Sequence, residues 1–170
     1  RIDDPAKLSE VPEGVFLLVS LSTIERLRRG LRAFMKRRSN KVCLLFDESD
    51  EISNPLSRRT RLSLALFRRA RYKMLATGMV TRNNVNELYP QFEMLYNNSV
   101  NMINYCPEAY FEDKDRDIVS RSNDRCGMPF PAYGGHNLFR ACFSPCRTTV
   151  FGIEKHNQDI YNKKELQRLI

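Results

Sequence analysis

Two adjacent carboxylates, Asp47 and Glu48, directly follow an apolar run from Val42 to Phe46. A nucleotide hydrolase needs this arrangement, because one carboxylate holds Mg²⁺, usually through water, and its neighbour orients or deprotonates the water that attacks a γ-phosphate. In that scheme Asp47 takes the metal role and Glu48 the base role. The same pattern also arises where a strand simply ends in a solvated turn, so on its own it leaves both interpretations open.

A second polar group follows the next apolar run. The run from Lys73 to Thr77 ends in Ala76-Thr77-Gly78. If both runs are neighbouring parallel strands, the Thr77 hydroxyl and the nearby amides reach the same sheet edge as Asp47. A hydroxyl there can bond to the carboxylates and respond to the presence of a γ-phosphate. The alternative is a turn in which Gly78 merely relieves backbone strain.

The elements that must position these groups alternate along the chain. Three unbroken apolar runs, Val15 to Val19, Val42 to Phe46 and Lys73 to Thr77, are typical of strands buried on both faces. A helix is predicted after the capping-box spacing Ser22-Thr23-Ile24-Glu25, and others over Arg58 to Ala70 and Asn84 to about Tyr96. This order predicts an α/β fold with a parallel sheet and right-handed crossovers.

The side chains of these helices divide into faces. We expect the following apolar positions to point inward: Ile24, Leu27, Leu31, Phe34 and Met35 in the first helix, Leu62, Ala65, Leu66 and Ala70 in the second, and Val85, Leu88, Phe92 and Leu95 in the third. In the second helix, Arg59, Arg61, Arg68 and Arg69 are expected to point outward. Tyr89, Phe92 and Tyr96 share one stripe and are predicted to be core residues rather than stacking platforms.

The last third of the chain has a different character. From about Pro107 it is rich in Gly and Pro, with a β-like run from Thr148 to Ile153 and a closing helix from about Asn162. The chain begins with Arg1 rather than Met and stops inside a helix-like pattern, so we expect it to be a fragment.

Composition narrows the class of protein. The chain has 170 residues, 42% of them hydrophobic and 28% charged. It has no apolar run of membrane-spanning length and no secretory leader, so we expect a soluble intracellular protein of the cytoplasm or nucleus, with a viral or phage origin equally compatible. Five cysteines, an odd number, favour free thiols in a reducing compartment, with Cys43 a small buried hydrophobe inside its strand.

Zinc is a lesser alternative for the last third. Cys126, Cys142, Cys146, His136 and His156 are ligand types for a tetrahedral site. Their spacing provides no second close pair, so we favour unlinked thiols over a zinc-dependent interaction insert at residues 106–160.

The net charge of +8 is unevenly distributed. Residues 1–82 hold 18 Lys and Arg against 9 Asp and Glu, whereas residues 83–170 hold 10 against 11. A basic surplus fits a polyanionic partner, although a solvated basic helix face explains it equally well. Ser20 and Thr23, at the start of the arginine-rich helix Arg26 to Arg38, would present hydroxyls and helix amides to a phosphate backbone.

Taken together, these motifs resemble those of a known family. Residues 47–54, beginning Asp-Glu-Ser-Asp, the segment Lys73 to Gly78 and the segment Asn83 to Tyr89 resemble the second and third motifs of the Swi/Snf-type ATPases of helicase superfamily two, which are DEAD/DEAH-like. Val19 to Thr23 resembles the segment that contacts the nucleic-acid backbone in that family, and Lys164 to Ile170 weakly resembles the helix before its arginine-rich motif.

The resemblance implies a RecA-like parallel sheet flanked by helices, as an incomplete P-loop NTPase domain with a loop-rich C-terminal insertion. Residues 1–105 would be the partial RecA-like domain, and residues 106–170 its insertion and closing helix. The implied ligands are ATP, Mg²⁺ and double-stranded DNA, with no membrane. The implied site residues are Asp47 and Glu48 for catalysis, with Asp47 holding Mg²⁺ through water, Thr77 and Gly78 for nucleotide binding, and Ser20, Thr23, Arg26 and Arg29 for nucleic acid.

The chain also departs from the family. Asp50 occupies the position of the usual His, and Met79 and Val80 replace the usual Thr-Pro, so hydrolysis is better supported than its coupling to movement. No Gly-x-x-x-x-Gly-Lys-[Ser/Thr] loop and no second RecA-like domain are present. We therefore expect ATP hydrolysis only when a longer chain supplies these parts. The alternative is a basic nucleic-acid-binding module without catalysis.

Overall fold

The computed structural model describes residues 5–81, 84–97, 135–144, 146–148, 154–156 and 160–170. The helices of this part are η1 (Pro5–Ser9), α1 (Ile24–Arg38), η2 (Ser39–Lys41), η3 (Ser49–Ile52), α2 (Arg58–Phe67), η4 (Val85–Glu87), α3 (Leu88–Tyr96), α5 (Gly135–Phe143) and α6 (Lys163–Leu169). The strands are β1 (Cys43–Phe46), β2 (Tyr72–Leu75), β3 (Cys146–Thr148) and β4 (Glu154–His156). None of these helices has the length and apolar character that crossing a membrane requires.

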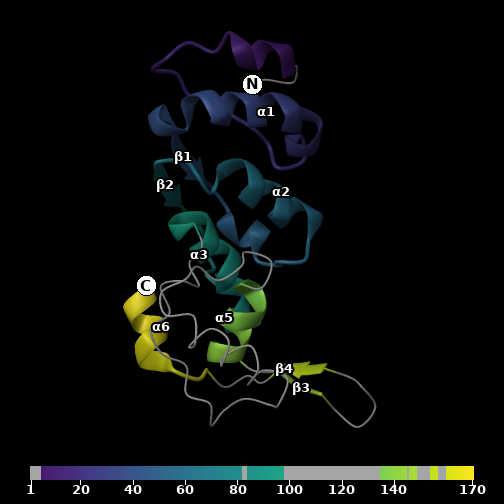
Figure 1. Ribbon diagram of the computed structural model, residues 1–170, viewed down its shortest axis with the longest axis vertical. Coiled ribbons are helices and arrows are strands. Elements are labelled where there is room, and N and C mark those ends of the chain that lie inside the picture. Colours follow the sequence, from purple (N-terminus) through teal and green to yellow (C-terminus); the bar gives the residue numbers. More distant parts are fainter. Residues whose placement is uncertain (1–4, 82–83, 98–134, 145, 149–153, 157–159) are drawn as a thin grey trace.

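The unit β1–α2–β2 forms the small parallel sheet predicted from the sequence (Figure 1). Cys43 lies opposite Tyr72, and Phe46 lies opposite Leu75, so the two strands end level with each other. The crossover helix between them makes the described part a mixed α/β structure. A second, antiparallel sheet pairs β3 with β4.

The predicted strand from Val15 to Val19 does not form. Its backbone has no strand partner among the described residues, and its side chains alternate instead of being buried on both sides. Leu17 and Val19 pack against the core, whereas Phe16 is 96% exposed. The apolar run is therefore covered on one side only.

The sheet formed by β1 and β2 is also covered on one face only. Phe46 is buried, whereas Leu45 and Met74 are each 61% exposed. Cys43 is exposed too, contrary to the buried position expected for it. The prediction of strands buried on both faces was wrong because the described helices pack on a single face of this sheet.

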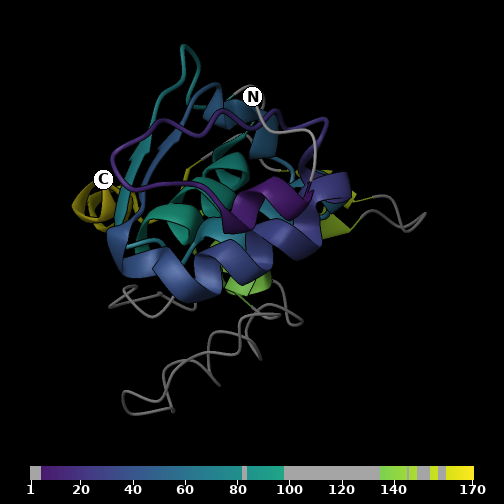
Figure 2. The ribbon, with the colours of Figure 1, turned by 90° about the horizontal axis from the view of Figure 1, so that it is seen from above.

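The helix α1 has the predicted apolar stripe but not the predicted cap. Its buried residues are Ile24, Leu27, Leu31, Phe34 and Met35. The capping box at Ser22 does not form, because Thr23 is the N-cap residue in a helical conformation and makes no side-chain cap hydrogen bond. The 3-10 helix η1 lies alongside α1 (Figure 2), with Leu8 buried in the same cluster as Leu27 and Leu31.

The helix α2 starts where predicted and ends earlier. Ser57 caps it by accepting a 3.1 Å hydrogen bond from the amide of Thr60. The helix ends at Phe67 rather than Ala70, and Ala65, predicted to point inward, is exposed. Small polar side chains, Thr60 and Ser63, are buried instead because α1 and α3 pack closely against this helix.

Arg68 was predicted to point outward and does not. Its Nη1 donates a 2.8 Å hydrogen bond to Oε1 of Glu93 on α3, and the two side chains are 25% and 3% exposed. The pair joins the end of α2 to the middle of α3. Periodicity within α2 contains no information about this partner, which lies 25 residues further on.

The C-terminal part is built around α5, which the sequence analysis missed. Leu138, Phe139 and Phe143 of α5 pack against α3 and α6 in one buried cluster. Glycines at the start of α5 suggested a loop, yet its apolar side chains recur at helical spacing. The closing helix α6 forms as predicted. Tyr89 and Phe92 are core residues, as predicted, whereas Tyr96 is 39% exposed.

Cys142 corrects a further expectation, because it is disulfide-bonded rather than a free thiol. It is fully buried within the cluster of α5. The predicted β-like run from Thr148 to Ile153 overlaps β3 only at Thr148, and its residues 149–153 lie outside the described residues.

Candidate functional site: the carboxyl edge of β1 and β2

Asp47 and Glu48 leave the end of β1 with both side chains exposed. Glu48 has a φ of 49°, in the left-handed region that a residue with a side chain adopts at a cost of about 1–2 kcal/mol. Its amide donates a 3.0 Å hydrogen bond to Oδ1 of Asp47. This turn directs both carboxylates into solvent at the sheet edge, where a metal-bound polyphosphate could reach them.

The backbone of the turn then returns to the second strand. The amide of Ala76 donates to the carbonyl of Phe46 at 2.9 Å, and the amide of Ser49 donates to the carbonyl of Ala76, also at 2.9 Å. The backbone pairing thus continues past the strands, to Ala76 after β2 and to Ser49 after β1. As a result, the residues after Phe46 and those after Leu75 lie next to each other.

Thr77 is brought to Asp50 by this backbone pairing. Its hydroxyl lies 3.0 Å from Oδ1 of Asp50 and 3.0 Å from the carbonyl oxygen of Met79, and it accepts a 3.1 Å bond from the amide of Met79. Asp50 is only 6% exposed. The hydroxyl predicted to contact the carboxylates therefore meets the buried Asp50, at the position where the resembling family has a histidine.

Helix α3 supports the same turn through a residue that the sequence analysis missed. The side-chain amide of Gln91 donates a 2.9 Å hydrogen bond to the carbonyl of Val80, and its Oε1 accepts a 3.4 Å bond from the hydroxyl of Ser49. Gln91 is 6% exposed. A glutamine within an otherwise apolar helix face was the available signal, because buried amides are retained where they have partners.

Gly78 is exposed and open. A Cβ added there would meet no atom within 4 Å, and its φ lies outside the left-handed region. Its backbone conformation therefore does not require glycine, which removes the strain-relief explanation. Because Gly78 has no side chain, the space next to Thr77 is open.

A polar hollow of about 350 Å³ adjoins the turn on its η3 side. It is lined by Asp50, Glu51, Ser53, Asn54, Ser57 and Arg59. Arg59 and Glu51 pair across it at 2.5 Å. Within the described residues, no three His, Cys, Asp or Glu side chains are grouped to hold a metal ion directly. Asp47 does not line this hollow. At the exposed sheet edge, Asp47 is the carboxylate that could hold a divalent cation through water.

The predicted nucleic-acid contacts lie around the start of α1. The hydroxyls of Ser20 and Ser22 are 2.8 Å apart, and that of Thr23 donates a 2.9 Å bond to the carbonyl of Ser20. These bonds form a compact turn at the helix start, with Ser20 exposed. Arg26 and Arg29 are exposed in the first two turns of α1. The four predicted residues thus belong to one end of one helix.

The zinc alternative loses one ligand, because the sulfur of Cys142 is committed to a disulfide. The side chains of Cys126, Cys146 and His156 lie outside the described residues.

No family model, no curated protein and no solved structure matches this chain significantly.

Proposed function

We propose that this chain is part of the motor domain of an ATP-dependent DNA translocase of the Swi/Snf type within helicase superfamily two. In this proposal the domain is RecA-like and is completed by a phosphate-binding loop and a second RecA-like domain. Asp47 holds Mg²⁺ through water, and Glu48 activates the water that attacks the γ-phosphate of ATP. Thr77 and Gly78 border the nucleotide.

The observation that carries the proposal is the level ending of β1 and β2. Two parallel strands deliver Asp47, Glu48 and Thr77 to one edge, and ligands of open parallel sheets bind at that edge. Both carboxylates are exposed, whereas Asp50 in the same turn is buried and bonded to Thr77. An exposed acidic pair backed by a buried, hydrogen-bonded turn favours a preorganised metal and water site over a loose solvated strand end.

The basic charge supports nucleic acid as the polyanionic partner. Ser20, Thr23, Arg26 and Arg29 share one end of α1, and a helix N-terminus with hydroxyls and arginines suits phosphate oxygens. Double-stranded DNA is the partner that the family resemblance implies. Contacts of this kind position the protein along the backbone without selecting a base sequence.

The test measures ATPase activity of the protein encoded by the full open reading frame that contains this chain, with and without double-stranded DNA. The wild-type protein should hydrolyse ATP faster when DNA is present. Glu48→Gln should lower the stimulated rate by about 10²–10⁴-fold, because loss of a positioned base typically has an effect of this size. Binding of ATP, followed with a fluorescent nucleotide, should persist.

The matched control is Glu13→Gln, an identical change at an exposed carboxylate that pairs with Lys41 on another surface. It should leave the rate unchanged. Equal background rates in wild type and Glu48→Gln, with DNA binding intact, would contradict the motor and leave a basic nucleic-acid-binding module without catalysis.

A further inference from the structure

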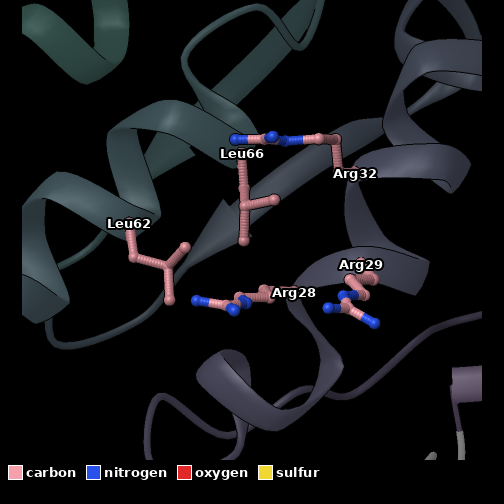
Figure 3. A pocket seen from close by; sticks show the side chains of 5 residues that line it. All are labelled: Arg28, Arg29, Arg32, Leu62 and Leu66. Atoms are coloured by element: carbon pink, nitrogen blue, oxygen red, sulfur yellow. The ribbon is translucent and has the colours of Figure 1, made fainter.

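A second hollow, of about 260 Å³, lies between α1 and α2 and has no lining residue in the turns after β1 and β2. Its walls are Arg28, Arg29 and Arg32 of α1 and Leu62 and Leu66 of α2. Figure 3 shows the guanidinium groups of Arg28 and Arg32 extending from α1 toward the two leucines. We call this site the basic hollow.

The three arginines of the basic hollow are exposed and form no ion pair or hydrogen bond with the part of the chain that the structure describes. The only acidic residue of α1 is Glu25, which pairs with Arg58 of α2, and α2 itself has no acidic residue. The positive charge around the hollow is therefore not neutralised from within these two helices. An anionic ligand would find three unoccupied guanidinium groups there.

The leucines on one side of the hollow favour a ligand that has an apolar group as well as negative charge. Leu66 is 4% exposed, and Leu62 is half-buried beside it. A phosphate backbone gains little from leucine side chains, and a double helix is too wide to enter a space of this size between two helices. An acidic peptide with one apolar side chain matches both parts, because its carboxylates meet guanidinium forks while its apolar group packs on leucine.

The arrangement on α1 suits an extended or helical peptide. Arg28 and Arg32 are four residues apart, so they lie on the same side of the helix about one 5.4 Å turn from each other. Two carboxylates of one peptide can then pair with them in sequence. The pairing of Glu25 with Arg58 already joins the same two helices by a carboxylate and a guanidinium.

From these observations we infer that the basic hollow docks an acidic segment of a partner protein, with an apolar side chain of that segment seated on Leu62 and Leu66. The docking site is separate from Asp47 and Glu48, and it does not depend on the proposed ATPase activity. Its Arg29 is also one of the proposed nucleic-acid contacts, so the test below changes only Arg28 and Arg32. It provides a recruiting or regulating contact for the domain.

Fluorescence anisotropy on this chain tests the inference, with a labelled peptide of glutamates around a central leucine as the probe. Arg28→Gln/Arg32→Gln should weaken binding about tenfold, since two exposed charge pairs contribute this much together. Replacing the leucine of the peptide by serine, or Leu62 by serine in the protein, should weaken binding about fivefold. Circular dichroism checks that each variant is folded.

The matched control is Arg37→Gln/Arg69→Gln, which removes the same charge from exposed positions outside the hollow and off the helical stripe of Arg28 and Arg32. It should leave peptide affinity within about twofold of wild type, because long-range charge effects are screened by salt. Equal weakening by both double variants, or no effect of the leucine-to-serine peptide, would overturn the inference. So would a labelled DNA duplex that loses affinity with Arg28→Gln/Arg32→Gln while the peptide does not, because the ligand would then be nucleic acid.

Discussion

The hydroxyl of Thr77 lies 3.0 Å from Oδ1 of Asp50, across 27 residues of sequence. The contact joins the turn after β2 to the turn after β1, which begins with the exposed Asp47 and Glu48. A carboxylate that accepts from a hydroxyl forms a stronger bond than a neutral acceptor does. The bond therefore links the positions of the two turns. In the proposed motor, it would transmit a change at one turn to the other.

Thr77→Val tests this contact. The variant keeps the shape of the side chain but leaves the buried Asp50 one donor short, so the free energy of unfolding should fall by about 1–3 kcal/mol. Chemical denaturation measures the change. Thr77→Ser, which retains the hydroxyl and loses the methyl group, should lose less than half as much. A larger loss for Thr77→Ser than for Thr77→Val would show that the methyl group matters more than the bond. In the full open reading frame, Thr77→Val should also reduce the stimulation of ATPase activity by DNA.

Arg68→Met tests the buried pair between α2 and α3. Removing the guanidinium leaves the carboxylate of Glu93, which is 3% exposed, without this cation. The loss of unfolding free energy should be about 3–5 kcal/mol, as is typical when one partner of a buried pair is removed. Thermal or urea unfolding followed by circular dichroism provides the measurement.

Two variants accompany that prediction. Arg69→Met changes the exposed neighbouring arginine and should cost less than about 0.5 kcal/mol. Arg68→Met/Glu93→Met replaces both charges with apolar side chains and should recover most of the loss. If the double variant were less stable than Arg68→Met, the pair would not be the source of the effect.

Gly135→Ala tests the contact between α5 and α3. A Cβ at Gly135 would lie 2.6 Å from the hydroxyl oxygen of Tyr89, whose ring packs near His136 and Phe139 and is only 6% exposed. The crowded ring cannot move aside freely, so the variant should lose about 1–3 kcal/mol of stability. Differential scanning calorimetry would detect this as a lower Tm.

Removing the clashing oxygen should reverse the effect. In Tyr89→Phe/Gly135→Ala the nearest ring atoms are 3.3 and 3.4 Å from the added Cβ, distances that a small shift relieves. Gly78→Ala is the matched glycine control, because its Cβ meets no atom within 4 Å, and its Tm should not change. A double variant no more stable than Gly135→Ala would place the cause elsewhere in α5.

Local patterns in the sequence determined much of the protein. The stripe from Ile24 to Met35 predicted α1 and its buried face, and the runs around Phe46 and Leu75 predicted two parallel strands with Asp47, Glu48 and Thr77 at their ends. These features depend on spacing within a few residues. Helical and strand periods therefore identify them without knowledge of distant contacts.

Tertiary structure alone decided which faces are covered and which polar groups meet. The run from Val15 to Val19 has a strand-like composition, but a strand needs hydrogen-bond partners on another segment, and none pairs with it in the described part. Arg68 points inward because α3 brings Glu93 to it. Thr77 bonds to the buried Asp50 rather than to Asp47, because the turn through the left-handed Glu48 leaves Asp47 and Glu48 exposed and buries Asp50.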